Sequence, residues 1–338
     1  MASESSAASD APERPVGWDH APEALVRLEC ASGGAVAWVC PGLGANAVAF
    51  AVKTPSGWRQ VLHHGSPDDV RERPSRFGLP ILFPFPGHMV GGTYTWRGAT
   101  YRMPTLNPAA ASYVHGFAHQ LPWRVTAQDA ASLTAILDTR TDLTPADRAG
   151  YPFDVTLTVQ IALVNGALSL TLEAENVGST EAPVGIGLHP YIDPAFFGVE
   201  DRTALGVFLP GQTRRLLTAA PPIPTGAREP ADPSQPVQPV PLGQQMLASR
   251  TDFGERPTTR IVGGAGHSAA TVEVVMDAGW EDVLLFAPAD GPSISIEPHT
   301  CAPGAASMAE DGPDGQRALA PGARLRVSAA ISTSHRIV

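Results

Sequence analysis

The fold class is decided by one stretch, Phe153-Asp-Val-Thr-Leu-Thr-Val-Gln-Ile-Ala-Leu163. Every odd position in it is apolar, and its first four even positions are polar. Alternation with a period of two puts the apolar side chains on one face of a β-strand and the polar ones on the other. The stretch therefore predicts a strand in a sheet that has one buried face and one face in water.

A second alternating run follows after a short turn. Leu168, Leu170 and Leu172 alternate with polar residues, and Asn165-Gly166 separates the two runs. Both positions of such a turn need a positive φ, which Asn and Gly adopt more easily than other residues. The sequence thus predicts an antiparallel hairpin here.

The rest of the chain carries many shorter strand patterns. With 33 Gly and 34 Pro, and with no window that shows an apolar stripe of period 3.6, the sequence disfavours helices. Many short strands with regular turn signals are typical of an all-β protein, here a large antiparallel β-sandwich. The runs lie near residues 24–30, 34–39, 46–53, 93–103, 123–137, 183–188, 204–209, 271–276, 282–287, 293–297 and 324–332.

Composition shifts suggest a simple domain organisation. Residues 1–22 are rich in Ala, Ser, Pro and Glu and predict a disordered N-terminal leader. Residues 23–338 predict a single β-sandwich domain, which is also the catalytic domain if the chain is an enzyme. Residues 210–242 contain a Pro-rich connection that cannot be a central strand, because proline lacks the N–H that a central strand needs. No new pattern begins after it, so we interpret it as a long excursion from one sandwich.

Charge and cysteine content exclude several classes of partner. The net charge of -10 argues against binding to nucleic acid or to an anionic membrane. The odd number of cysteines, 3, and the absence of a CxxC pair argue against a disulfide framework. We see neither a signal-peptide pattern nor a membrane-spanning stretch, so we expect a cytoplasmic protein.

Three segments differ from ordinary strand-and-turn sequence. They are Tyr113-Val-His115-Gly116-Phe117, Gly185-Ile-Gly187-Leu-His189-Pro190-Tyr191 and Ile294-Ser-Ile296-Glu297-Pro298-His299-Thr300. Each has an ionisable residue at the end of an apolar run, directly before Gly or Pro. Such a strand end is a rigid place from which to present a side chain, although a single histidine there is more often structural. No HxH or HExxH spacing and no nucleotide-binding motif accompanies them, which argues against a metal site and against a nucleotide cofactor. The absence of a G-x-S-x-G motif argues against nucleophilic hydrolysis.

Taken in order, these segments resemble the aldose 1-epimerase (galactose mutarotase) family. Gly78-Leu-Pro80-Ile-Leu-Phe83-Pro84-Phe-Pro86-Gly87 is similar to a Pro-rich stretch of that family, and Gly92-Thr-Tyr-Thr-Trp96-Arg-Gly98-Ala-Thr-Tyr101 to the hairpin that follows it. Pro321-Gly322 resembles the family's last turn. The resemblance spans about residues 25–334 and implies a galactose mutarotase-like supersandwich.

The resemblance also implies a mechanism. Mutarotation removes a proton from the anomeric hydroxyl of a sugar and protonates its ring oxygen, so we expect one base and one acid on opposite sides of the sugar. By the family pattern Glu297 is the base, His189 is the acid, and His115 donates a hydrogen bond to the ring oxygen. The substrate is then a monosaccharide, and no cofactor is needed. We expect the attraction between Glu297 and His189 to keep the former ionised and the latter protonated near neutral pH.

The residues that would grip the sugar depart from the family pattern. Gly87-His88 stands where the family has Asn-Arg, so His88 becomes a candidate binding residue and Arg76 a candidate replacement for the missing arginine. Asp252 matches the family's substrate-binding Asp, and Tyr191 offers a ring to the apolar face of a sugar. The simpler interpretation of Arg76 is a surface arginine in a salt bridge.

Other functions stay open at this point. A hexose-6-phosphate 1-epimerase would use basic residues, and Arg71, Arg73 and Arg76 form a candidate cluster. A non-catalytic sugar-binding protein could share the fold, although here the acid–base set is complete. A hydrolase or lyase would need a pair of carboxylates that flank the scissile bond. We expect a monomer or a homodimer.

Overall fold

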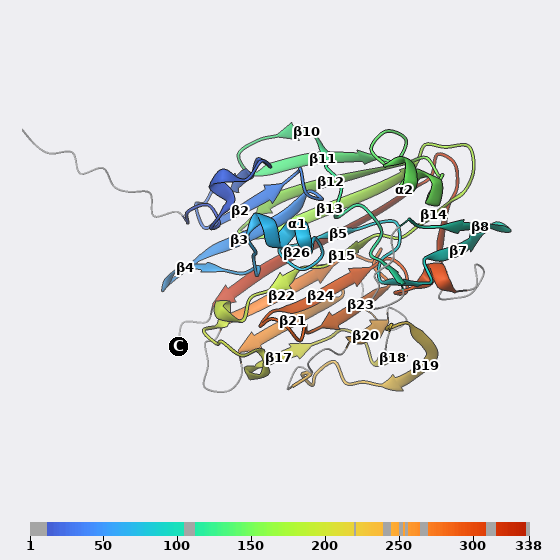
Figure 1. The fold of residues 1–338 in the computed structure, drawn as a ribbon. Helices are drawn as coiled ribbons and strands as arrows, with labels where there is room; N and C mark the ends of the chain where they lie inside the picture. The colour runs from blue at the N-terminus through green and yellow to red at the C-terminus, as the bar shows by residue number, and fades with distance from the viewer. Residues whose placement is uncertain are drawn as a thin grey trace, which may run out of the picture.

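The computed structural model describes residues 12–104, 112–219, 221–238, 245–249, 253, 256–263, 270–308 and 316–335. Two large antiparallel sheets dominate it, and helices are few and short (Figure 1). The expected all-β sandwich is confirmed.

We call the first sheet the framework sheet. Its strands are long, and neighbouring strands are antiparallel along their whole register. In spatial order they are β10 (Arg124–Gln128), β11 (Ser132–Asp138), β12 (Val155–Val164), β13 (Ala167–Asn176), β26 (Arg324–His335), β22 (Ala270–Met276), β21 (Thr258–Gly263) and β17 (Leu205–Phe208).

We call the second sheet the site sheet. Its strands are shorter, and β16 (Tyr191–Ile192) joins it by pairing with β24. The other strands, in spatial order, are β19 (Pro224–Pro230), β18 (Thr213–Leu217), β20 (Gln245–Ser249), β23 (Asp282–Phe286), β24 (Ile294–His299), β15 (Gly187–Leu188) and β5 (Ile81–Leu82).

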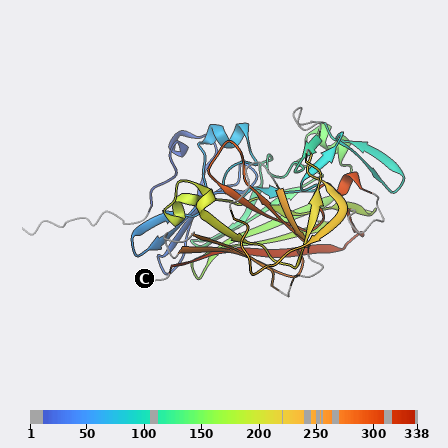
Figure 2. The ribbon, with the colours of Figure 1, turned by 90° about the horizontal axis from the view of Figure 1, so that it is seen from below.

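Smaller elements surround the two sheets. Figure 2 shows the framework strands as one layer, with α1 and the β7–β8 hairpin on the same side of it. A four-stranded sheet contains β1 (Val26–Glu29), β2 (Ala35–Cys40), β3 (Asn46–Thr54) and β4 (Gly57–Gln60). Strand pairs are β6 (His88–Val90) with β9 (Ser112–Val114), β7 (Thr93–Trp96) with β8 (Ala99–Arg102), and β14 (Ala182–Val184) with β25 (Arg317–Leu319). The helices are α1 (Pro67–Glu72), α2 (Pro145–Gly150) and the 3-10 turns η1 (Trp18–His20), η2 (Pro194–Phe197), η3 (Arg202–Ala204) and η5 (Ala305–Ser307).

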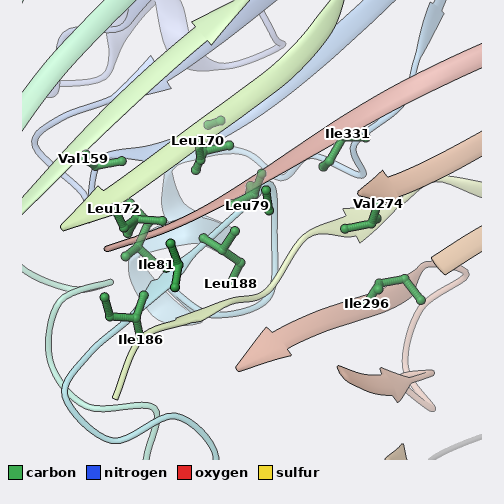
Figure 3. Packing of buried hydrophobic residues seen from close by; sticks show 14 of the residues in the cluster. Leu79, Ile81, Val159, Leu170, Leu172, Ile186, Leu188, Val274, Ile296 and Ile331 are labelled. Atoms are coloured by element: carbon green, nitrogen blue, oxygen red, sulfur yellow. The ribbon is translucent and has the colours of Figure 1, made fainter. Parts of the chain in front are cut away.

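The core lies between the two large sheets. In Figure 3, Leu170, Leu172 and Ile331 of the framework sheet and Leu188 and Ile296 of the site sheet belong to one packed cluster. Each of these side chains is at most 2% exposed. Burying one such side chain contributes about 1.5–3 kcal/mol, so this contact fixes the site sheet on the framework sheet.

The predicted hairpin is confirmed. Strand β12 alternates between buried and more exposed positions along its whole length, and Val164 pairs with Ala167 across the turn. Asn165 and Gly166 have φ of 52° and 81°, as the turn requires.

Two other segments differ in detail from the expectation. Within the stretch interpreted as a leader, Trp18 is 1% exposed and its indole N–H donates to the Gly65 carbonyl. The Pro-rich connection contains a hairpin of β18 and β19. The proline rule still holds, because β19, which begins and ends with Pro224 and Pro230, lies at the edge of the site sheet, whereas the more central β18 has no proline.

Candidate active site

Strand β24 separates core residues from site residues by simple alternation. Ile294 and Ile296 point into the core, as Figure 3 shows for Ile296. Successive side chains of a strand point to opposite faces. Ser295, Glu297 and His299 therefore lie on the other face of β24, which we call the site face.

His189 reaches the same face from the end of β15. Its backbone N–H donates to the Pro80 carbonyl, and its ring is stacked on Tyr191 with 4.7 Å between the centroids. Its Nδ1 lies 2.6 Å from the Ser295 hydroxyl. The backbone, the ring face and Nδ1 of His189 are thus all held, so the other ring nitrogen, Nε2, has a fixed direction.

That nitrogen faces Glu297. His189 Nε2 lies 3.3 Å from Glu297 Oε1 and 3.4 Å from the Tyr191 hydroxyl. Glu297 is only 1% exposed, and its Oε1 has no aligned hydrogen-bond donor within the described residues. A desolvated carboxylate oxygen without a donor is well suited to accept a proton from a bound hydroxyl group.

The third predicted residue, His115, lies next to His189. Its φ is 67°, and its ring centroid is 5.1 Å from that of His189. Its backbone N–H donates to the Gly87 carbonyl, and the Gly87 N–H donates to its Nδ1 over 3.2 Å. Because Nδ1 accepts, the proton of the neutral ring is on Nε2, which makes His115 a hydrogen-bond donor.

Gly116, next to His115, allows the backbone to pass close to Phe83. A Cβ at this position would be 2.0 Å from the Phe83 carbonyl oxygen, and the φ of Gly116 is 72°. Only glycine fits such a place. In His115-Gly116-Phe117 the glycine is therefore required by the backbone, and the histidine supplies the hydrogen-bond donor.

Burial controls the charge of the two histidines. It lowers the pKa of His189 to about 4, although the Glu297 carboxylate acts in the opposite direction. Burial, aided by the neighbouring His189, also lowers the pKa of His115 well below its ordinary value. We expected the attraction of Glu297 to keep His189 protonated near neutral pH. This expectation was wrong, because the desolvation of a fully buried ring outweighs that attraction.

The rim of the site holds two of the predicted binding residues. The guanidinium of Arg76 lies 5.6 Å from the Tyr191 ring centroid and forms an ion pair with Asp290. His88 Nδ1 lies 2.9 Å from the Ser112 hydroxyl, and its ring centroid is 6.3 Å from that of His115. The ion pair agrees with the simpler interpretation of Arg76.

The structure thus brings together six of the seven predicted residues, whereas Asp252 lies outside the described residues. Sequence reasoning missed Ser295, His299, Asp282 and Phe286. Ser295 and His299 could have been found from their position two residues before and after Glu297 on one strand. Asp282 and Phe286 are paired with His299 and Ser295 across the sheet. This register is a long-range contact that no local pattern reveals.

Two further findings concern cofactors and membranes. Among the described residues, no group of three or more histidine, cysteine or acidic side chains is arranged to hold a metal ion. No helix in the described part of the chain is long and apolar enough to cross a membrane.

Comparison with known proteins identifies the family. The sequence model of the family described as aldose 1-epimerase matches residues 27–254, which is more than half of the chain. The chain belongs to the aldose 1-epimerase family. The match includes His115 and His189, and Glu297 lies beyond it.

This member of the aldose 1-epimerase family has low sequence identity to the following similar proteins. A galactose mutarotase-like protein from Clostridium acetobutylicum has 18% identity and a TM-score of 0.75, with 93% of this chain and 99% of the other covered. A GalM/aldose epimerase homologue from C. elegans has 17% identity and a TM-score of 0.74, with 93% and 100% covered. The uncharacterized protein YihR of Escherichia coli is 29% identical over 134 residues, 39% of this chain and 42% of YihR. The chain thus matches about two fifths of the length of YihR.

Proposed function

We propose that this chain is an aldose 1-epimerase, an isomerase that interconverts the α and β anomers of a free monosaccharide. The observation that carries the proposal is the convergence of His115, His189 and Glu297 from three distant segments, with His189 Nε2 only 3.3 Å from Glu297 Oε1. The family membership supports the same reaction class.

The proposed reaction consists of two proton transfers in each direction. Glu297 Oε1 takes the proton of the anomeric hydroxyl, the bond between C1 and the ring oxygen breaks, and the ring oxygen takes the proton from His189 Nε2. His115 donates its Nε2–H to the ring oxygen while charge develops there. The aldehyde rotates about the C1–C2 bond, and the reverse proton transfers close the ring on its other face. We expected the acid and the base on opposite sides of the sugar, whereas His189 Nε2 and Glu297 Oε1 are only 3.3 Å apart. They can be adjacent because the anomeric oxygen and the ring oxygen are both bonded to C1.

The rim favours an uncharged sugar over a sugar phosphate. Both Arg73 and Arg76 form ion pairs with Asp290, so a phosphate would have to displace this carboxylate. Tyr191 and Phe286 lie beside His189 and offer aromatic faces to the C–H groups of a pyranose. The hexose-6-phosphate epimerase is therefore the weaker alternative.

The cysteines support an intracellular place of action. Cys30, Cys40 and Cys301 are free and buried. Secreted proteins tend to pair their cysteines. We infer a cytoplasmic enzyme, which localisation of the tagged full-length chain would test.

Polarimetry tests the proposed function. Freshly dissolved α-D-glucose, α-D-galactose and a hexose 6-phosphate are each followed with and without the purified protein. We expect the protein to accelerate the approach to the equilibrium rotation for at least one of the free sugars and to act less on the phosphate. If no sugar responds, the proposal fails in favour of a non-catalytic sugar-binding protein; a response to the phosphate alone would favour the alternative epimerase.

A further inference from the structure

His299 is a buried histidine next to Glu297, and its ring nitrogens have no hydrogen-bond partner in the described part of the chain. Its side chain is 0% exposed, and neither Nδ1 nor Nε2 has a hydrogen-bond partner among the described residues. Buried polar atoms of folded proteins are nearly always paired, so such a ring calls for an explanation. Its Nε2 lies 3.6 Å from Glu297 Oε2, just beyond hydrogen-bond distance.

The two sides of Glu297 differ in a way that suits a general base. Oε1 faces His189, whereas Oε2 faces His299. Glu297 and His299 are two residues apart on β24 and so share the site face. If Oε2 is held by a donor, the remaining oxygen, Oε1, keeps one direction toward the substrate.

The His299 ring fits beside strand β15 because a glycine lies opposite it. Gly187 is the register partner of His299 on β15, and a Cβ on Gly187 would be 2.9 Å from His299 Cδ2. On its other side His299 pairs with Asp282 of β23. Asp282 is itself held, because Arg215 Nε donates to its Oδ1 over 3.2 Å. The ring is thus enclosed between two strands and cannot turn away from Glu297 without displacing them.

We propose that His299 is a positioning residue for Glu297: its Nε2–H donates to Oε2 and leaves Oε1 free for the anomeric hydroxyl. This inference rests on the proposed function. A small movement that shortens the 3.6 Å separation completes the bond when a sugar is bound, and such tightening is common in active sites. His299 does not touch the substrate, so it acts on the rate and not on sugar binding.

Two variants test the role in catalysis. His299→Gln keeps an N–H donor near the position of Nε2, and His299→Leu has a similar volume without a donor. We expect His299→Leu to lower kcat roughly 10- to 100-fold, as for other partners that orient a reactive group, with KM within about twofold. His299→Gln should recover most of kcat. Thermal unfolding of both variants serves as the control for folding.

Nitrogen NMR of the wild-type protein gives a second test that needs no activity. Long-range proton–nitrogen correlations report which ring nitrogen carries the proton. We expect His299 to carry it on Nε2, and a proton on Nδ1 alone would overturn the inference. So would wild-type kcat in folded His299→Leu, or equal losses in both variants. If the wild-type protein accelerates no sugar, the proposed function fails, and the NMR result alone decides on the hydrogen bond.

Discussion

The framework sheet and the site sheet share one core but are built differently. Strands β12 and β13 of the framework sheet have 10 residues each and bury every second side chain. In the site sheet, β24 buries all of its 6 residues, and β15 and β16 have 2 residues each. The framework sheet has one face in water, whereas the central strands of the site sheet have two dry faces.

This difference separates stability from chemistry. Polar side chains on the outer face of the framework sheet are solvated. In the site sheet, by contrast, Glu297, His299 and Asp282 are buried, and each has polar side-chain atoms without a hydrogen-bond partner among the residues that the structure describes. An unpaired buried polar atom costs about 1–3 kcal/mol. We therefore expect the framework sheet to provide most of the favourable free energy of folding, and the buried reactive groups of the site sheet to lower the stability.

The largest expected effect is the loss of activity when the acid is removed. His189→Gln should lower kcat roughly 10²- to 10⁴-fold, because the ring oxygen loses its proton donor. The free energy of unfolding should fall by only about 1 kcal/mol, because the variant loses the hydrogen bond to Ser295.

Polarimetry and urea unfolding measure the two quantities. The matched control is His20→Gln, because His20 is exposed and lies outside the site. Wild-type activity in His189→Gln would show that His189 is not the acid.

A substitution in the core of the framework sheet should have the opposite effect: it should lower stability and leave activity unchanged. Leu170→Ala removes a core side chain that is 1% exposed and should lower the free energy of unfolding by about 2–5 kcal/mol. The kcat/KM of the folded protein should stay within about twofold. Ser169→Ala, one position along on the outer face, is the control and should change stability by less than about 0.5 kcal/mol. A loss of activity in folded Leu170→Ala would contradict the division between the sheets.

The pH dependence of the reaction sharpens the account of the site. The proposed mechanism needs His189 protonated, and burial lowers the pKa of this ring to about 4. Above that pH the protonated fraction falls about tenfold per pH unit, so kcat/KM should rise roughly 100-fold when the pH is lowered from 8 to 6. Polarimetric rates across this range measure it. A flat profile would mean that His189 does not have to be protonated in the free enzyme.

The smallest effect concerns stability and pH. Burial lowers the pKa of His119 to about 3 in the folded protein, whereas the unfolded chain takes up this proton near pH 6.5. The unfolded state therefore binds more protons below pH 6.5, and stability is lost as the pH falls toward 3.

Between pH 6 and pH 5 the wild-type protein should lose about 1 kcal/mol more of its unfolding free energy than His119→Gln. Urea unfolding at both pH values measures this difference. Parallel losses in the two proteins would exclude a neutral, buried His119.

The sequence predicts the framework sheet better than the site sheet, and the reason is physical. A strand with one wet face must alternate, so the stretch from Phe153 to Leu163 could be recognised from its own residues. Strand β24 is buried on both faces. Alternation places Ser295 and His299 on the same face as Glu297, but which face carries the site is not visible until the strand is paired.

The site could be predicted as far as its motifs reach. His115, His189 and Glu297 each end an apolar run before Gly or Pro, and this local setting was visible in the sequence. The partner of Arg76 was not visible, because Asp290 comes from a loop more than 200 residues away. The protonation of His189 was predicted wrongly for the same reason, since burial is a property of the assembled fold.

The most direct test of the account is the exchange between anomers at equilibrium. Carbon saturation transfer between the C1 signals of an aldose labelled at C1 is measured with wild-type protein and with Glu297→Gln at equal concentration. The account predicts clear transfer with the wild-type protein and none above background with the variant, while both proteins stay folded. Equal transfer with folded Glu297→Gln, or none with the wild-type protein, would contradict the claim that the Glu297–His189 pair opens and recloses the sugar ring.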